Sequence, residues 1–242
     1  MENKSALERD GYQVIDDFIS HDECKKILGL VNKYREQNEI PEIHRPVKGR
    51  SLRYFVINGE MIENDLPDIW GLYQNKVHQQ INDLTQDDFA LLENKLVGVN
   101  VNIMPPEKSS YRWHYDRTTI TSILYLNQVK SGETVLYPHY RILLKNNKFA
   151  KLQQLMDKII TLKPIRTLFK KKVVVAPVPG RLAIMEGKTC WHSVRSLEGD
   201  KDRINIIMSF DYPGIQFPME EGLDKYLYTR EKQKSADPNY AK

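Results

Sequence analysis

The sequence predicts a mainly β fold with flanking helices, in the α+β class. Three observations predict it: short segments with the alternating or continuously apolar pattern of strands, glycine- and proline-containing turns between them, and longer segments near the start with helical spacing. The strand segments are residues 99–104, 122–127, 181–185 and 203–211. A chain of 242 residues can bury a sizeable core, so we expect a single domain over residues 1–242.

The first elements are expected to be a strand and then helices. Residues 11–18 have a strand pattern, and Ser20 and Glu23 then form a possible capping box at which a helix begins. This helix should end near Gln37, and its apolar face is Cys24, Ile27, Leu28, Val31 and Tyr34. A second helix is expected after Asp65. Its buried stripe is Ile69, Trp70, Tyr73, Val77 and Ile81.

Composition and charge agree with those of an ordinary soluble enzyme. The net charge of +4 is only mildly basic, and nucleic-acid binding proteins usually cluster Lys and Arg on one face. Cys24 and Cys190 fall in no recognisable pattern and suit a reducing compartment. The sequence has neither an apolar run that could span a membrane nor a signal-peptide pattern. We therefore expect a cytoplasmic protein without nucleic-acid or membrane partners.

His114 and Asp116 are the first candidate site residues. Alternate side chains of a strand point to the same face, so a His-x-Asp pair places an imidazole and a carboxylate side by side. A later histidine, His192, would complete a facial triad, which leaves other positions of an octahedral metal open and suits Fe(II) in oxygenases. The alternatives are an exposed strand pair and, for His192, simple packing beside Trp191.

Arg203 is the second candidate. It begins a near-alternating segment that places Arg203, Asn205, Ile207 and Ser209 on one face. A guanidinium there could bind a dicarboxylic acid through paired hydrogen bonds. The alternative is an ordinary surface arginine that follows a charged turn. Residues 99–104 alternate in the same way, and their expected interior face is Asn100, Asn102 and Met104.

The order of these elements resembles that of the Fe(II)/2-oxoglutarate-dependent oxygenases, with the prolyl-hydroxylase-like branch most similar. The shared order is His-x-Asp, a Tyr-Leu-Asn strand, Gly-Glu-Thr, Pro-Gly, a distal histidine and then an arginine, over residues 95 to 212. The resemblance implies a double-stranded β-helix, also called a jelly roll or cupin-like fold. The helices of the first half would then brace one of its sheets from behind.

The resemblance implies a role for each matching residue. His114, Asp116 and His192 would bind Fe(II), and Arg203 would pair with the distal carboxylate of 2-oxoglutarate, which is consumed together with O2. The implied reaction converts 2-oxoglutarate to succinate and CO2 and hydroxylates an unactivated C–H bond. Asp116 favours hydroxylation over halogenation, because related halogenases have a small residue at this position. Desaturation and ring formation stay open.

Three further residues are expected near the cosubstrate. Tyr125 lies where the prolyl-hydroxylase-like branch often has a tyrosine that supports the same carboxylate. Asn102 and Asn205 are on the faces expected to line the interior, where they would contact 2-oxoglutarate. The alternative for Tyr125 and Asn102 is a structural role in the core.

Residues 141–170 are the main departure from a compact prolyl-hydroxylase-like pattern. They contain a helix whose apolar side is Phe149, Leu152, Leu155, Met156, Ile159 and Leu162. We expect this helical insertion to cover the barrel, and a substrate lid or partner surface is the alternative. The polar tail, residues 230–242, is expected to fray.

The sequence does not name its substrate. Tyr111, Arg117 and Arg53 flank the expected metal face, and either arginine could receive a substrate carboxylate. The alternative for each arginine is exposure to solvent. The long insertion and residues 211–214 loosely resemble a subgroup that acts on free amino acids and related metabolites. We therefore expect hydroxylation of a free amino acid or an amino-acid-derived metabolite.

Other functions stay open. A peptidyl or protein hydroxylase of the prolyl type would need an open groove, which the insertion disfavours. Arg203 and Asn205 match the start of the Arg-x-Asn-x-Thr-x-Arg signature of AlkB-type nucleic-acid demethylases, but Ile207 and Ser209 break the rest of it. A non-catalytic jelly-roll binding module would keep the fold and use its cavity for recognition. The intact triad and Arg203 argue against that alternative.

Overall fold

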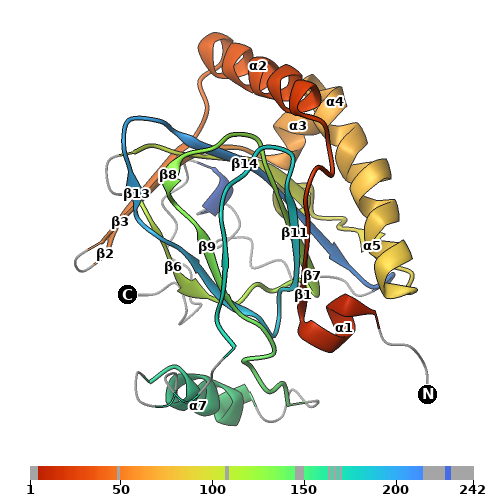
Figure 1. Cartoon of the computed structure of the whole chain (residues 1–242), viewed down its shortest axis with the longest axis vertical. Helices are drawn as coiled ribbons and strands as arrows, with labels where there is room; N and C mark the ends of the chain where they lie inside the picture. Colours follow the sequence, from red (N-terminus) through yellow and green to blue (C-terminus); the bar gives the residue numbers. More distant parts are fainter. Residues whose placement is uncertain are drawn as a thin grey trace.

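Two larger antiparallel sheets and a layer of helices make up most of the molecule (Figure 1). The structure is a computed structural model, and it describes residues 5–47, 50–106, 109–144, 150–162, 165, 168, 171–214 and 227–229. Phe149 and the expected polar tail lie outside the described residues.

The larger sheet brings together strands from distant parts of the chain. Its order is β1-β11-β7-β14-β5-β3-β2, and β4 pairs with β14. The bounds are β1 Tyr12–Ile15, β2 Glu42–Val47, β3 Arg50–Ile57, β4 Ala90–Leu91, β5 Val99–Met104, β7 Ile120–Tyr125, β11 Leu182–Glu186 and β14 Arg203–Asp211. Antiparallel pairing between segments so far apart in sequence is typical of a jelly roll.

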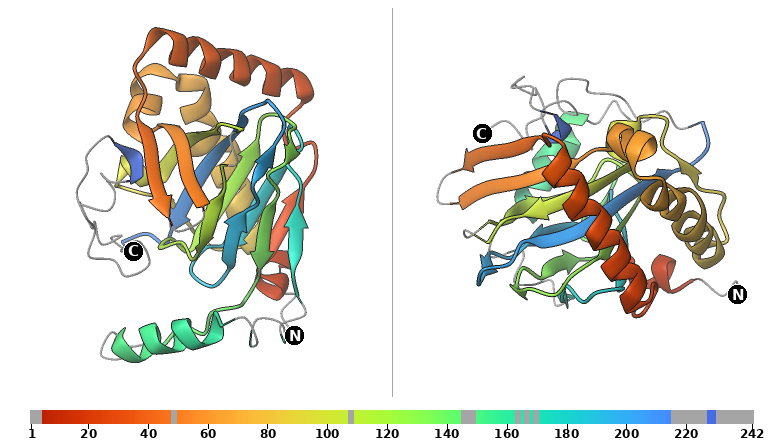
Figure 2. Two further views of the ribbon diagram at one scale, coloured as in Figure 1. Left: turned by 90° about the vertical axis from the view of Figure 1, so that its left-hand side faces the viewer. Right: turned by 90° about the horizontal axis from the view of Figure 1, so that it is seen from above.

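The smaller sheet faces the larger one (Figure 2). Its order is β10-β9-β12-β6, and a short pair, β13-β8, lies beside it. The bounds are β6 Tyr111–His114, β8 Lys130–Ser131, β9 Thr134–Tyr137, β10 Val173–Val175, β12 Trp191–Val194 and β13 Leu197–Glu198. The two facing sheets form a double-stranded β-helix, so the predicted mainly β fold with flanking helices is confirmed.

Helices cover the outer face of the larger sheet (Figures 1 and 2). The helix predicted from Ser20 to Gln37 is confirmed together with its Ser20–Glu23 capping box. The helix predicted after Asp65 is also confirmed, although it is built from three consecutive segments. The bounds are α1 Ala6–Asp10, α2 His21–Gln37, α3 Gly59–Asp65, α4 Pro67–Gly71, the π-helix η1 Leu72–Val77, α5 His78–Thr85, α6 Lys95–Gly98 and α7 Ala150–Ile160.

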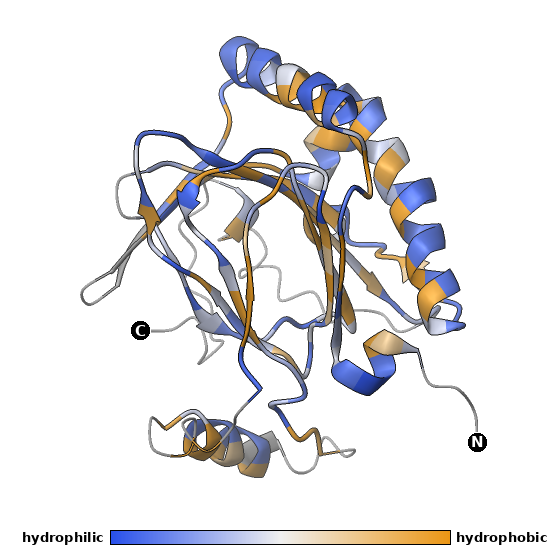
Figure 3. Cartoon of the chain, viewed as in Figure 1, coloured by the Kyte–Doolittle hydropathy of each residue, from blue (hydrophilic) through white to orange (hydrophobic). Residues whose placement is uncertain are grey.

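Alternation along β5 and β14 separates the core from the interior of the barrel. Val99, Val101 and Ile103 of β5 point toward the helices and join the main hydrophobic core. The same core contains Ile204, Ile206, Met208 and Phe210 of β14. Figure 3 shows the matching pattern on the helices, whose apolar residues lie along the side nearest the sheet. The opposite faces of β5 and β14 are therefore available to line a cavity.

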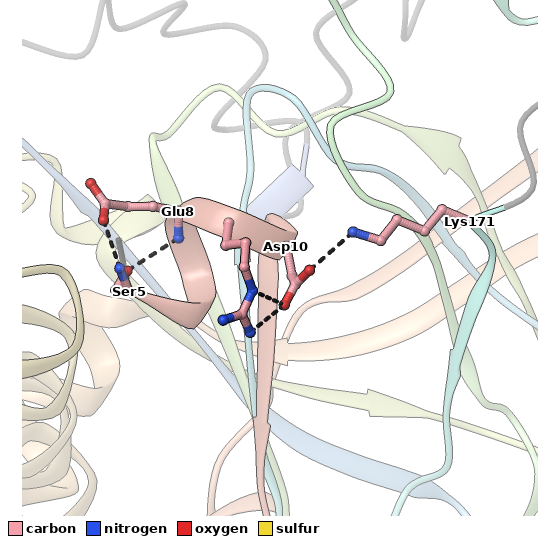
Figure 4. A network of polar contacts seen from close by, with 5 residues as sticks. Ser5, Glu8, Asp10 and Lys171 are labelled. Atoms are coloured by element: carbon pink, nitrogen blue, oxygen red, sulfur yellow. Dashed lines mark hydrogen bonds and ion pairs between the residues drawn. The ribbon is translucent and has the colours of Figure 1, made fainter. Parts of the chain in front are cut away.

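An ion pair between Asp10 and Lys171 joins the N-terminal segment to the residues just before β10 (Figure 4). Ser5 and Glu8 form a capping box for α1, and Gly11 ends this helix at a φ of 75°. Asp10 then accepts hydrogen bonds from Arg9 and from Lys171, the latter at 3.1 Å. The strand expected over residues 11–18 is shorter than predicted, because the chain turns at Asp17, where φ is 52°.

The helix in the insertion is confirmed as α7, but its predicted position is wrong. Leu152, Leu155, Ile159 and Leu162 are between 45% and 54% exposed, so the apolar side of α7 does not cover the barrel. Figure 1 shows α7 standing apart from both sheets. It is tethered by the Arg141–Asp157 ion pair at 2.6 Å and by a hydrogen bond from the Tyr140 hydroxyl to the Ile160 carbonyl.

Among the helices that the structure describes, none combines the length and the apolar character that a membrane span requires.

Candidate functional site

A cavity lies between the two sheets and is lined by both of them. Its wall on the larger sheet contains the residues of β5 and β14 that point away from the hydrophobic core. The predicted interior faces of β5 and β14 are therefore confirmed, and they are Asn100, Asn102 and Met104 on β5 and Arg203, Asn205, Ile207 and Ser209 on β14. The antiparallel register places Asn102 beside Asn205 and Asn100 beside Ile207.

The structure brings His114, Asp116 and His192 together at one side of this cavity. His114 and His192 are direct partners across β6 and β12, with ring centroids 4.1 Å apart. Asp116 Oδ1 lies 3.4 Å from His114 Nε2, and Asp116 Oδ2 lies 3.5 Å from His192 Nε2. All three ligand atoms lie within 4.8 Å of one another, which is close enough to share one metal ion.

Backbone carbonyls orient both imidazoles. His114 Nδ1 lies 2.8 Å from the Arg112 carbonyl oxygen, and His192 Nδ1 lies 3.0 Å from that of Cys190. A carbonyl only accepts, so each Nδ1 must carry the proton and donate it. Each Nε2 is then left with a lone pair that points toward Asp116. This is the arrangement expected of histidines that bind a metal through Nε2.

Electrostatics keep this donor set in the state that binds a cation. Burial, together with the neighbouring His114, lowers the pKa of His192 to about 4, so its imidazole is neutral at pH 7. Burial alone would raise the pKa of Asp116, but His192, His114 and a hydrogen bond from Thr121 together hold that pKa well below its usual range. Two imidazoles and one carboxylate are a donor set that fits Fe(II) or a similar divalent ion.

Asp116 is not held by the strand that was predicted to carry it. Strand β6 ends at His114, and Asp116 lies in the loop that follows. Its backbone N–H donates to the Gly187 carbonyl at 3.0 Å, and the Thr121 hydroxyl donates to Asp116 Oδ2 at 2.7 Å. The predicted proximity of His114 and Asp116 is therefore confirmed, but strand alternation is not its cause. Sequence reasoning missed both Thr121 and Gly187.

Gly187 is needed because the chain passes very close to the carboxylate here. A Cβ at this position would lie 2.6 Å from the Thr118 carbonyl oxygen and 2.9 Å from Asp116 Cβ. We expect Gly187→Ala to displace Asp116, lowering iron affinity roughly 10–100-fold and the free energy of unfolding by about 1–3 kcal/mol.

Gly29→Ala is the matched control for this prediction, because a Cβ there meets nothing within 4 Å in helix α2. It should leave iron affinity unchanged and slightly raise the thermal midpoint. Iron titration and thermal unfolding of both variants measure the two effects. Unchanged iron affinity in Gly187→Ala would contradict the role assigned to this close approach.

Arg203 is a buried cation at the opposite end of the cavity wall. Its side chain is 2% exposed and donates to Thr134 Oγ1 at 3.1 Å and to Asn205 Oδ1. Within the described ranges no carboxylate pairs with it, and its Nε has no hydrogen-bond partner. The Nδ2 of Asn205 is likewise unsatisfied there. A buried guanidinium without a counter-charge is costly, and an anion bound at this end of the cavity would supply that counter-charge.

The ring of Tyr125 packs against the guanidinium group of Arg203. Its ring lies 5.2 Å from the Arg203 guanidinium carbon, and its hydroxyl donates to Thr134 Oγ1 at 2.7 Å. Thr134 therefore receives hydrogen bonds from both Tyr125 and Arg203 while it also lines the cavity. A direct contact of Tyr125 with the cosubstrate stays a prediction, as does contact of Asn102 and Asn205 with it.

The predicted substrate residues separate into two groups. Tyr111 and Arg117 line the cavity, and the Tyr111 ring lies 4.7 Å from that of His114. The expectation for Arg53 is wrong. It alternates with Tyr54, which faces the cavity, and its Nε instead lies 2.6 Å from Glu42 Oε1 on the neighbouring strand.

The C-terminal segment adds a part of the wall that sequence reasoning missed. Leu227 and Tyr228 line the cavity although they lie beyond the last strand. The Tyr54 hydroxyl donates to the Leu227 carbonyl at 2.8 Å, and the Asn58 amide donates to that of Tyr228 at 3.2 Å. These two bonds hold the segment against β3.

The facing sheets and the triad between them define a double-stranded β-helix with a candidate metal centre. No protein-family model and no curated protein matches this sequence. Solved structures match the fold. The α-ketoglutarate-dependent epimerase SnoN from nogalamycin biosynthesis superimposes with a TM-score of 0.67 at 14% identity, over 85% of this chain and 80% of SnoN. (α-Ketoglutarate is another name for 2-oxoglutarate.)

Two other similar structures widen the comparison. A Pseudomonas putida prolyl-4-hydroxylase has a TM-score of 0.53 at 16% identity, over 86% of this chain and 96% of the hydroxylase. HygX from Streptomyces hygroscopicus, solved with nickel, 2-oxoglutarate and hygromycin B, has a TM-score of 0.59 at 10% identity, over 87% and 86% of the two chains. The chain therefore has the fold of the Fe(II)/2-oxoglutarate oxygenases.

Proposed function

We propose that this protein is a 2-oxoglutarate-dependent non-haem iron oxygenase that oxidises a small molecule. One observation carries the proposal: a partly buried His-Asp-His triad and a buried arginine without a carboxylate partner in the described structure share one cavity. The triad matches the needs of a divalent metal, and the arginine matches those of a dicarboxylate. A non-catalytic binding module would have no need to combine the two.

The metal would be held by His114 Nε2, His192 Nε2 and the carboxylate of Asp116. Fe(II) would supply the activation of O2 for attack on a C–H bond. The protein's contribution is to orient the donors through the carbonyls of Arg112 and Cys190 and the hydroxyl of Thr121. Loss of such supporting bonds typically weakens metal binding or activity.

2-Oxoglutarate would lie with its distal carboxylate on Arg203. The unsatisfied Nε of Arg203 and Nδ2 of Asn205 are donors, and an incoming carboxylate would accept from them. Similar structures support this choice, since SnoN has been solved with Fe3+ and α-ketoglutarate and HygX with nickel and 2-oxoglutarate. Tyr125 and Thr134 would keep the guanidinium in place for that contact.

The class of substrate is proposed from the similar structures and from the sequence. SnoN and HygX have been solved with nogalamycin RO and hygromycin B, which favours a small molecule here as well. A free amino acid or an amino-acid-derived metabolite stays the prediction from the sequence, and Arg117 would receive its carboxylate. The similarity to a prolyl-4-hydroxylase keeps a peptide or protein substrate as the second candidate.

Turnover of 2-oxoglutarate tests the proposal. The native chain, loaded with Fe(II) under reducing conditions and then exposed to air, should release succinate from 2-oxoglutarate even without its substrate, and a chelator should stop the release. Release that is independent of iron, or absent from a chain shown to retain iron and 2-oxoglutarate, would contradict it.

Tyr125→Phe tests whether Tyr125 contacts 2-oxoglutarate itself or acts only by positioning Thr134. If the tyrosine acts through Thr134, the variant should raise the KM for 2-oxoglutarate only about two- to tenfold, the effect of one neutral hydrogen bond. Steady-state succinate release measures this KM. An increase as large as that caused by removal of Arg203 would mean that Tyr125 contacts the cosubstrate itself.

A further inference from the structure

Asn100 places a buried side-chain amide in the wall of the cavity. Its side chain is 1% exposed, it lines the cavity, and neither Oδ1 nor Nδ2 has a partner within the part of the chain that the structure describes. A buried polar atom left unsatisfied is costly, and here one side chain leaves both a donor and an acceptor in that state. Such a residue is retained at a stability cost when a ligand supplies the missing partners.

Asn100 lies toward the end of the cavity that holds Asp116, away from the end that holds Arg203. Its cross-strand neighbour is Ile207, and the next interior residue of β14, Ser209, is the partner of Thr121, which donates to Asp116. Arg203 lies at the other end of β14. A 2-oxoglutarate molecule that reaches Arg203 would therefore leave Asn100 for the substrate.

We propose that Asn100 determines substrate specificity by binding a neutral group that both donates and accepts hydrogen bonds, a carboxamide or a hydroxyl, at the metal end of the substrate. This inference rests on the proposed function. An amide side chain pairs with such a group through both of its polar atoms. Among the cavity-lining residues that the structure describes, the carboxylate is that of Asp116, which is committed to the metal. A substrate ammonium group would therefore lack a counter-charge at this position, and a carboxylate would leave the acceptor of Asn100 unpaired.

Asn205 provides a matched control of the same residue type. It is also 1% exposed and lines the same cavity from the adjacent strand, but its Oδ1 already accepts from Arg203. Asn100→Leu removes an amide with no partner among the described residues and should leave the thermal midpoint unchanged or raise it by about 2–4 °C, whereas Asn205→Leu should lower it by a similar amount. A clear fall in the midpoint of Asn100→Leu would overturn the premise that this amide is unsatisfied in the ligand-free protein.

The substrate test uses succinate release above the substrate-free rate, for the native chain and for Asn100→Leu. The probes are free amino acids with carboxamide, hydroxyl, charged or apolar side chains, together with simple sugars, which carry neutral hydroxyls. We expect stimulation by carboxamide or hydroxyl compounds, and the two groups of probes tell these apart. Asn100→Leu should lower kcat/KM for them at least about tenfold, mainly through KM, with an unchanged KM for 2-oxoglutarate.

Two results would overturn the inference without touching the proposed function. One is stimulation only by charged or apolar compounds, or by none of the probes. The other is an equal kcat/KM in the native chain and Asn100→Leu. The iron–2-oxoglutarate charge-transfer band, recorded for both proteins, identifies the separate case in which the proposed function itself fails, because the native chain would then lack the band.

Discussion

His192→Ala should abolish iron binding and with it all 2-oxoglutarate turnover. The triad supplies every protein ligand that we assign to the metal, and loss of supporting bonds alone typically costs about 10–100-fold in metal affinity. Removal of a ligand should cost more than that, because the two remaining groups, His114 and Asp116, hold a divalent ion far less well. Titration of the anaerobic protein with Fe(II) measures the affinity directly, and succinate release measures the turnover.

His21→Ala is the control for this substitution. His21 is an exposed residue at the start of α2, which covers the outer face of the larger sheet, and it does not line the cavity, so its removal should change neither quantity. Thermal unfolding of the ligand-free His192→Ala protein shows whether the fold survives. Iron affinity that is the same in a folded His192→Ala variant and in the native chain would mean that the triad is structural, and the binding-module alternative would then lead.

Arg203→Leu should raise the KM for 2-oxoglutarate by about 30-fold or more. A charge-assisted hydrogen bond contributes about 1.5–3 kcal/mol, and a guanidinium can make two of them to one carboxylate. Arg203 is positioned for this by Thr134 and Asn205 and has no competing carboxylate among the described residues. Its removal should therefore weaken binding of the dicarboxylate while the metal triad stays intact.

Pyruvate is the matched probe for this prediction, because it has the 2-oxo acid group of 2-oxoglutarate but not its distal carboxylate. The native chain should strongly prefer 2-oxoglutarate as an iron ligand, and Arg203→Leu should lose most of that preference. Arg203→Lys keeps the charge but not the planar fork, so it should fall between the two. A preference for 2-oxoglutarate that is undiminished in Arg203→Leu would show that another residue binds the distal carboxylate.

The sequence predicted the parts of the site that depend on strand alternation. The segment from Arg203 to Asp211 has a strong period of two, and the structure forms β14 over that same range with the predicted interior face. The predicted interior face of β5 was confirmed for the same reason. A pattern of this kind is local, so it can be read without knowledge of the neighbours.

Other parts depend on which segments meet in space, and no local pattern records that. Gly187 contacts Asp116 from far along the chain, and Leu227 returns to the barrel beyond β14. Thr121 is near Asp116 in sequence, but its hydrogen bond depends on how the loop between them folds back. The burial of Arg203 after a charged turn is likewise a tertiary property.

The errors in the prediction have the same origin. Arg53 was expected to flank the metal face, but its place depended on which face of β3 pointed inward, and it pairs with Glu42 on the outside instead. Helix α7 is amphipathic by sequence, yet the residues of its apolar side are exposed. Helical spacing indicates that a helix has an apolar face, but it does not indicate what that face packs against.

Anaerobic titration of the purified chain with Fe(II) and then 2-oxoglutarate tests the central claim most directly. Chelation of iron by 2-oxoglutarate should give a weak metal-to-ligand charge-transfer band in the visible range that saturates with the cosubstrate. The band should be absent from Asp116→Ala and should need a much higher 2-oxoglutarate concentration in Arg203→Leu. A native chain that retains no iron and shows no band would contradict the assignment of this cavity as an oxygenase site.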